Sequence, residues 1–273
     1  MGLRFRVLGS GSTGNATLVE AAGTRILIDA GIGPRALAER VQSAGVDPAS
    51  LEAVLVSHEH VDHARGASAF SEKWGVRLCG TRGTYAAAGF GSADIAGYDV
   101  LSAGVPRKIG AVTVTGVALP HDAAEPLAFV VSCNGESLGH ATDFGQVGRG
   151  VVEAFRRCDA LLVESNYDPR LLRDGPYPWS LKERILGPLG HLSNADVARY
   201  LAEALGEACH TVVLAHLSQT NNHPELALMA ADEALRRRGR TEVRLELTGP
   251  EGTEWIAVGR GSEPEGPDQL RLF

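Results

Sequence analysis

A tight group of histidine and acidic side chains, placed directly after a short apolar run, constrains the fold of this chain more than any other feature. Residues 54–56 are Val-Leu-Val, and His58, His60, Asp62 and His63 fall in the seven residues that follow. The apolar run predicts a buried strand, which places the group on a loop held by a rigid scaffold. His58 and His60 project to the same side of an extended chain. Imidazole and carboxylate groups bind Zn²⁺, Mn²⁺ and Fe²⁺, so the loop predicts a metal site.

Three further side chains of the same chemistry stand just beyond other predicted strands. They are His121, Asp143 and His216. Taken singly, each is explained equally well as a capping or surface residue. A carboxylate in the position of Asp143 is able to bridge two metal ions, so the three residues together become candidate ligands.

The pattern of apolar residues predicts a mixture of strands in hairpins and peripheral helices. Strands are predicted at residues 3–8, 16–20, 25–29, 54–56, 112–118, 127–132, 137–141, 161–163, 212–214, 243–247 and 253–258, and helices at 34–44, 62–74, 194–205 and 224–237. The three strands predicted between residues 112 and 141 are separated by short connections, so we expect each to pair antiparallel with the next. Such a mixture favours two sheets packed face to face with helices outside.

Composition narrows the possible environments of the chain. Its 273 residues are 44% hydrophobic, which is enough for a substantial core. No run approaches the roughly 20 apolar residues that cross a bilayer, and residues 1–7 do not resemble a signal peptide. The four cysteines show no paired spacing and are typical of reduced thiols. We therefore predict a cytoplasmic protein that binds no membrane. The net charge of −7 argues against a broad basic surface for nucleic acid.

The histidine loop has the form HxHxDH, and the later candidates follow it in the order His, Asp, His. In this order the sequence resembles the metallo-β-lactamase superfamily over residues 1–258, which we expect to be one domain. The resemblance implies a four-layer αββα sandwich, in which helices flank two mixed sheets. It also implies two divalent ions, Zn²⁺ or Mn²⁺, with Fe²⁺ as the alternative. One ion would be held by His58, His60 and His121, the other by Asp62, His63 and His216, and Asp143 would bridge them.

The same resemblance gives roles to residues beside the ligands. Asp62 would orient the attacking water as well as bind a metal. Asp29 would support the metal loop from behind, although a turn or helix-cap role also explains it. His191, in Gly-His-Leu-Ser-Asn before a predicted helix, resembles the His-x-Ser/Thr region of phosphodiesterase members. There it would contact the scissile phosphate and protonate the leaving alkoxide, whereas the plainer alternative is a surface residue at a helix start.

Several segments are similar to one branch of the superfamily, the YycJ-type (VicX/WalJ) branch, whose members are regarded as DNA exonucleases. These segments are residues 8–15, 164–168, 177–178, 181–182, 184–185, 190–194, 214–218 and 221–222. The resemblance implies a two-metal phosphodiesterase that acts as a DNA exonuclease in DNA repair. The alternatives are a small-molecule metallohydrolase for a cyclic phosphodiester, thioester or lactone, and a non-catalytic regulatory adaptor.

The tail after the domain has its own character. Residues 259–268 are polar and rich in Gly and Pro, which predicts a flexible tether. The peptide that follows closely resembles the QLxLF motif by which bacterial proteins bind the sliding clamp; its matching residues are Gln269, Leu270, Leu272 and Phe273. A fortuitous apolar end is the alternative. A tether to a clamp already on DNA would raise the effective concentration of the protein at the DNA to roughly millimolar. This would offset the weak DNA affinity expected of an acidic protein.

Overall fold

Two mixed β-sheets form the centre of the protein. A computed structural model describes residues 2–259, and within that range each sheet contains seven strands. The first sheet consists, in spatial order, of β14 (Ile256–Ala257), β1 (Arg4–Gly9), β2 (Ala16–Ala21), β3 (Thr24–Ile28), β4 (Ala53–Leu55), β5 (Leu78–Gly80) and β6 (Tyr98–Val100). Its strands pair antiparallel from β14 to β3 and parallel from β3 to β6.

The second sheet is built from the rest of the chain. In spatial order it contains β7 (Pro106–Ile109), β8 (Val112–Ala118), β9 (Leu127–Cys133), β10 (Glu136–Ala141), β11 (Ala160–Glu164), β12 (Thr211–Ala215) and β13 (Arg244–Leu247). The pairing is antiparallel from β7 to β10, as the sequence predicts for β8 to β10, and parallel from β10 to β13.

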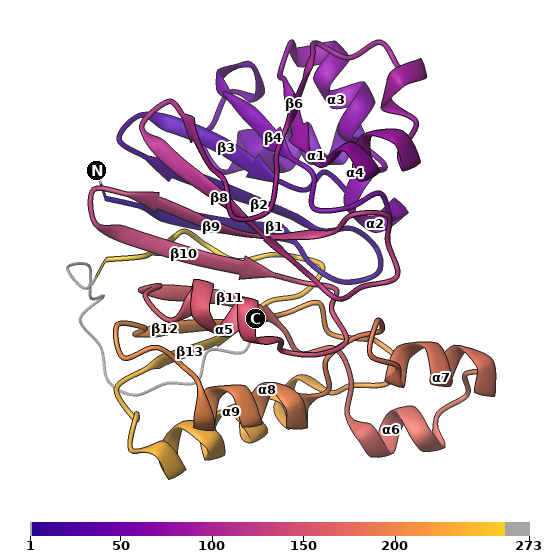
Figure 1. Ribbon diagram of the computed structural model, residues 1–273, viewed down its shortest axis with the longest axis vertical. Helices are drawn as coiled ribbons and strands as arrows, with labels where there is room; N and C mark the ends of the chain where they lie inside the picture. The colour runs from indigo at the N-terminus through magenta and orange to yellow at the C-terminus, as the bar shows by residue number, and fades with distance from the viewer. Residues whose placement is uncertain (1, 260–273) are drawn as a thin grey trace.

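Helices lie outside the two sheets. They are α1 (Pro34–Ser43), α2 (Val61–Ala64), α3 (Ala67–Trp74), α4 (Arg82–Ala87), α5 (Arg149–Phe155), α6 (Pro169–Asp174), α7 (Trp179–Leu186), α8 (Asn194–Glu203) and α9 (Pro224–Arg238), with 3₁₀ turns η1 (Pro48–Ser50) and η2 (Phe90–Ser92). Helices α1, α3 and α4 lie on one outer side of the molecule and α8 and α9 on the opposite side (Figure 1). The four-layer αββα sandwich predicted from the sequence is therefore confirmed.

Three apolar clusters explain this layering. Phe5, Leu55 and Phe129 belong to a core that lies between the sheets. The outer face of the first sheet packs against α1 and α3, and the outer face of the second sheet packs against α8 and α9. Strands such as β11 and β12 are buried on both faces, which is why they are continuous apolar runs rather than alternating ones.

Helix ends follow local sequence signals where these are present. Ser193 caps α8 and forms a capping box with Asp196. The prediction of one helix over residues 62–74 was wrong, because the helix is interrupted at Gly66, between α2 and α3. The Gly66 N–H bonds to Ala30 O at 2.7 Å. A Cβ at Gly66 would lie 2.4 Å from Ile32 O, so the close approach of these two segments requires glycine.

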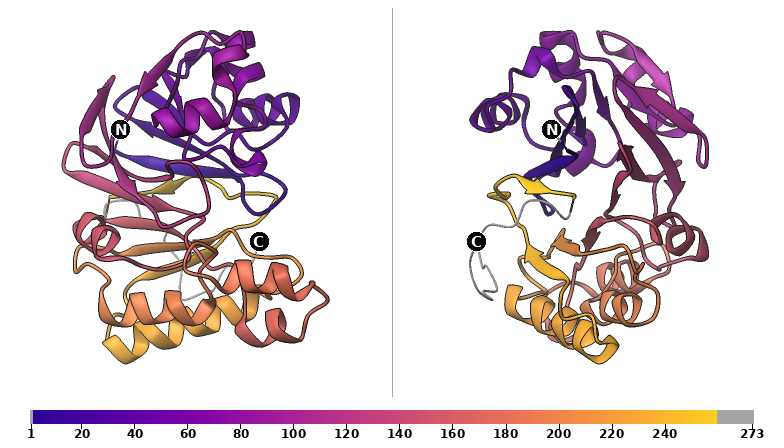
Figure 2. Two further views of the ribbon diagram at one scale, coloured as in Figure 1. Left: turned by 45° about the vertical axis from the view of Figure 1, so that its right-hand side comes forward. Right: turned by 90° about the vertical axis from the view of Figure 1, so that its left-hand side faces the viewer.

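Several short elements that the apolar pattern does not predict complete the fold. Helices α6 and α7 form a short hairpin that projects from the sandwich at the end where α8 and α9 lie (Figure 1, Figure 2). None of the helices in residues 2–259 is long and apolar enough to cross a membrane. The tail residues Gln269, Leu270, Leu272 and Phe273 lie outside the described part of the chain.

Candidate metal centre

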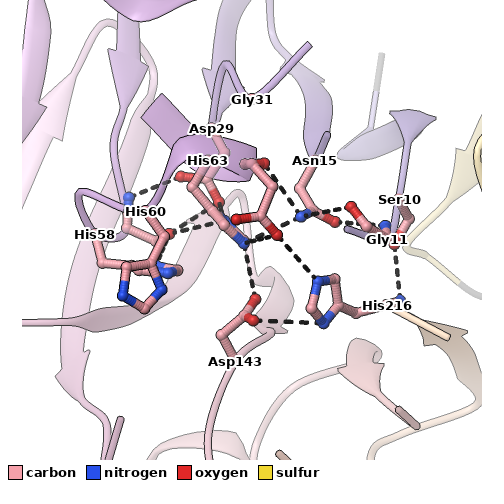
Figure 3. A network of polar contacts seen from close by, with 12 residues as sticks. Ser10, Gly11, Asn15, Asp29, Gly31, His58, His60, His63, Asp143 and His216 are labelled. Atoms are coloured by element: carbon pink, nitrogen blue, oxygen red, sulfur yellow. Dashed lines mark hydrogen bonds and ion pairs between the residues drawn. The ribbon is translucent and has the colours of Figure 1, made fainter. Parts of the chain in front are cut away.

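The seven predicted ligands meet at one edge of the sandwich, on loops that follow strands of both sheets. The HxHxDH loop leaves β4, His121 follows β8, Asp143 follows β10 and His216 follows β12. In parallel strands the carboxyl ends lie together at one edge, where sites of α/β proteins form. The structure divides the seven residues into two neighbouring groups. Figure 3 shows His58 and His60 of one group beside His63, Asp143 and His216 of the other.

His58, His60 and His121 form the first group, with one ring nitrogen from each lying within 4.8 Å of the others. His121 Nδ1 is 3.0 and 3.2 Å from the backbone carbonyls of residues 189 and 190, so it is the protonated nitrogen and leaves Nε2 as a ligand atom. His58 Nδ1 contacts Ser57 Oγ at 3.0 Å. The His58 Nε2 is buried and has no hydrogen-bond partner among the described residues. A buried nitrogen with a free lone pair fits a metal ion, since such atoms are otherwise costly.

Asp62, His63, Asp143 and His216 form the second group, again with ligand atoms within 4.8 Å of one another. His63 Nε2 is 2.8 Å from Asp143 Oδ2, and His216 Nε2 is 3.5 Å from Asp62 Oδ2. Imidazole nitrogens that converge with two carboxylates are a donor set for a divalent cation. The side chains of both groups therefore fit metal ions.

A carboxylate stands behind each histidine of the second group. Asp29 Oδ2 lies 2.8 Å from His63 Nδ1, and Glu164 Oε2 lies 2.9 Å from His216 Nδ1. Such contacts fix the tautomer, so that Nε2 of each ring faces the metal site. Asp29 also accepts hydrogen bonds from Ser57 N at 2.8 Å and Ser57 Oγ at 2.9 Å, which agrees with the predicted support of the metal loop.

Glu164 is the functional residue that sequence reasoning missed. It is completely buried, and it accepts hydrogen bonds from Asp143 N at 3.1 Å and Leu192 N at 2.8 Å. Its Oε2 is also 3.0 Å from His191 Nδ1. Glu164 thus connects the predicted bridging residue, one predicted ligand and the predicted acid. The available signal was a charged residue that ends an apolar strand, a place where an unpaired carboxylate is unfavourable.

His191 lies beside both groups. Its ring centroid is 5.5 Å from that of His121 and 5.4 Å from that of His216. Because its Nδ1 is held by Glu164, Nε2 is the ring nitrogen that remains for a substrate. The geometry therefore favours a functional role for His191 over that of a plain residue at a helix start.

The glycine-rich turn after β1 supports the site through hydrogen bonds. Ser10 Oγ accepts from His216 N at 2.8 Å, and Asn15 Nδ2 donates to Asp62 O at 3.2 Å. Gly31 lies so close to the metal loop that a Cβ there would be 1.7 Å from Asp62 O. These contacts fix the backbone positions from which Asp62 and His216 point inward.

Three site residues have a left-handed backbone although they carry side chains. The φ angles are 62° at Asp29, 62° at Asp143 and 54° at His216. Non-glycine residues adopt this region at a cost, and such residues cluster at functional sites. The strain lies on Asp143 and His216 of the second group and on Asp29, which stands behind His63.

Charges within the site stabilise one another. Burial opposes ionisation of Asp143, but His216 and His63 outweigh it and hold the pKa of Asp143 well below its usual range. Burial likewise acts on Glu164, but His191 and His216 bring its pKa to about 2. Burial and the neighbouring His63 hold the pKa of His58 well below its usual range. The carboxylates are therefore ionised and His58 is neutral at pH 7. Burial opposes protonation of His63 and His216, but Asp143 and its neighbours outweigh it, holding the pKa of His63 well above its usual range and raising that of His216 to about 10, so these two rings must release a proton when a metal ion binds.

The chain matches known proteins in both sequence and fold. A model of the β-lactamase superfamily domain matches residues 24–217, so the chain belongs to the metallo-β-lactamase superfamily. It is a metal-dependent hydrolase.

Two curated relatives are similar over most of their length. The exodeoxyribonuclease YycJ of Bacillus anthracis is 34% identical over 88% of this chain and 91% of its own. The exodeoxyribonuclease WalJ of Streptococcus pneumoniae is 32% identical over 84% of this chain and 87% of its own.

Solved structures show the same fold at low sequence identity. The metallo-β-lactamase fold protein YhfI of Bacillus subtilis superposes with a TM-score of 0.73 at 15% identity, covering 93% of this chain and 98% of its own. The short form of human tRNase Z gives a TM-score of 0.64 at 15% identity, covering 94% of this chain and 99% of its own. Both likenesses concern the fold alone.

Proposed function

We propose that the chain is a phosphodiesterase with two divalent metal ions, and that it acts as a DNA exonuclease. The observation that carries this proposal is the position of His191 beside both ligand groups, with Nδ1 held by Glu164 at 3.0 Å. An alkoxide leaving group needs a proton donor at this position, whereas a thiolate or enolate is expelled without one. The two curated relatives, both named exodeoxyribonucleases, make DNA the favoured substrate.

The roles of the residues follow from their groups. His58, His60 and His121 would hold one ion, and Asp62, His63 and His216 would hold the other, with Asp143 between them. When bound, such ions lower the pKa of a water molecule and neutralise charge on the phosphate; Zn²⁺, Mn²⁺ and Fe²⁺ all suit these donors.

Two side chains would then orient the attacking water and donate a proton to the leaving group. The side chain of Asp62 is 21% exposed, whereas that of Asp143 is 3% exposed, so Asp62 is the carboxylate that reaches the solvent side of the site. There it orients the attacking water. His191 Nε2 donates a proton to the leaving oxygen, while Glu164 holds the other side of the ring.

The deciding experiment uses end-labelled single- and double-stranded DNA and RNA with the purified protein and Mn²⁺ or Zn²⁺. We expect stepwise shortening of DNA that is abolished by Asp62→Ala and by His60→Ala, with the fold retained. His223→Ala is the matched control, because His223 is an exposed histidine at the start of α9. Full activity of Asp62→Ala with its metal content measured would contradict the proposed centre.

Hydrolysis of a cyclic phosphodiester, thioester or lactone without DNA cleavage would favour a small-molecule hydrolase. Metal binding without any turnover would favour an adaptor.

The proposal extends to DNA repair through the peptide at residues 269–273. We infer that Leu270, Leu272 and Phe273 enter an apolar pocket of the bacterial sliding clamp and that Gln269 adds a directed hydrogen bond. A protein that binds this clamp would work in the cytoplasm, which is the location that we propose. Burial of an apolar side chain contributes about 1.5–3 kcal/mol, part of which is lost in ordering the peptide. Titration of the clamp with a peptide spanning residues 267–273 tests this interaction. Equal binding by a control with Leu272 and Phe273 changed to Ala would remove the clamp from the proposal.

A further inference from the structure

A cavity of about 230 Å³ opens beside His191, outside the two ligand groups. It reaches the metal centre at Asp122, whose Oδ1 lies 3.4 Å from His121 Nε2. Arg184 lies at the same border and donates from Nε to Asp122 Oδ2 at 2.5 Å. The cavity therefore begins where a scissile phosphate would meet His191.

The α6–α7 hairpin forms the apolar wall of this cavity. Tyr177, Leu181 and Ile185 line it and belong to a small hydrophobic cluster that is separate from the main cores. Lys182 is buried and its Nζ donates to backbone oxygens of residues 173 and 175, both at 2.7 Å, which fastens α7 to the end of α6. These hydrogen bonds hold the wall in position, and the wall presents an aromatic ring beside aliphatic side chains.

The rest of the lining is polar. Asn166 and Ser218 lie on loops that follow β11 and β12. Asn166 Nδ2 donates to His216 O at 2.8 Å, so its amide is positioned by the metal centre itself. An apolar wall with a few fixed amide and hydroxyl groups suits a flat ring with polar edges. The volume lies below the roughly 300–1,000 Å³ of pockets for drug-sized ligands, so the occupant is a small unit rather than an oligonucleotide.

We propose that this cavity binds the nucleobase on the leaving side of the scissile phosphate, with Tyr177 as its stacking surface. The inference rests on the proposed nuclease function, since His191 defines the leaving side. A base seated here cannot remain stacked or paired in a duplex. The enzyme should therefore prefer single-stranded or frayed ends, and the hairpin of α6 and α7 is a specificity element rather than part of the catalytic machinery.

The test uses the dinucleotide TpT and two analogues, each with one base removed to leave an abasic sugar. The products identify the leaving side, because the phosphate stays on the other nucleoside. We expect Tyr177→Ala to raise KM for TpT at least fivefold, the lower end of what base stacking contributes. That effect should disappear on the analogue that lacks the leaving-side base, and Tyr177→Phe should restore binding of TpT. Trp179→Ala is the matched control, because Trp179 is an exposed aromatic residue on α7 that does not line the cavity.

A binding measurement separates the inference from the proposed activity. Isothermal titration of the full-length protein, treated with chelator, should show weaker binding of the leaving-side abasic analogue than of TpT, and the difference should vanish in Tyr177→Ala. If TpT is hydrolysed but neither KM nor binding depends on that base, the cavity has another role. If the metal-loaded protein hydrolyses no phosphodiester at all, the proposed function fails and the inference fails with it.

Discussion

Replacement of Glu164 by Gln is the perturbation whose effect the structure defines best. Glu164 Oε2 lies 3.0 Å from His191 Nδ1, 2.9 Å from His216 Nδ1 and 3.1 Å from Asp143 N. Glutamine keeps one carbonyl oxygen, which can still accept from Leu192 N. Its amide nitrogen would then face ring N–H groups that require an acceptor.

The expected loss follows from these contacts. A hydrogen bond to a charged group contributes about 1.5–3 kcal/mol, so the loss of two histidine contacts should lower the free energy of unfolding by about 3–6 kcal/mol. The ring of His216 also loses the carboxylate that orients it. Loss of such an orienting group typically lowers metal affinity or activity by about 10- to 100-fold, and we expect Glu164→Gln to fall in that range.

Urea unfolding of the metal-free protein measures the stability, and competition with a chromophoric chelator measures the metal affinity. Glu20→Gln is the matched control, because Glu20 is also a buried carboxylate but pairs with Arg4 at 2.6 Å and Arg25 at 3.1 Å on β1 and β3. The control should lose stability and keep its metal affinity. Wild-type metal affinity and hydrolysis in Glu164→Gln would refute the role assigned to Glu164.

Three further predictions concern other parts of the site and its support. His191→Ala should slow DNA cleavage far more than cleavage of a nitrophenyl phosphodiester, whose good leaving group needs no proton; steady-state kinetics on both substrates decide, and equal losses would leave only phosphate positioning. Gly31→Ala should lower the free energy of unfolding by about 1–3 kcal/mol and reduce the amount of bound metal, because the added Cβ would lie 1.7 Å from Asp62 O. Gly33→Ala is its control, because a Cβ there has no atom within 4 Å; melting temperatures and metal analysis compare the two variants. Burial lowers the pKa of His140 from 6.5 to about 4, so below pH 6.5 the unfolded chain takes up a proton that the folded chain does not. The free energy of unfolding should therefore fall by about 2 kcal/mol more in wild type than in His140→Gln between pH 7 and pH 5, and parallel pH profiles would contradict this.

The sequence predicts the layered fold and the ligand positions because both depend on local patterns. Buried parallel strands are continuous apolar runs, and the residue after such a run lies at a sheet edge. His58 and His216 are visible in this way. Their grouping with Asp143 came from resemblance, because no local pattern states which strand ends are neighbours in space.

Other features depend on long-range contacts that leave little trace in the sequence. Glu164 contacts partners 27 and 52 residues away, so it looks like an ordinary strand-ending carboxylate. The interruption at Gly66 arises from a backbone bond to Ala30, which no helix propensity reports. Helices α6 and α7, of six and eight residues, are too short to show a clear apolar period, and their cluster forms only when Tyr167 packs against Leu172 and Ile185.

The order of strands relates two carboxylates of the site to each other. Each sheet consists of three antiparallel pairings followed by three parallel ones, so β3 in the first sheet corresponds to β10 in the second. Asp29 directly follows β3 and Asp143 comes just after β10, and both have φ of 62°. The two carboxylates thus lie at the ends of corresponding strands of the two sheets. The two carboxylates lie on opposite sides of one ring, since Asp29 Oδ2 is 2.8 Å from His63 Nδ1 and Asp143 Oδ2 is 2.8 Å from His63 Nε2.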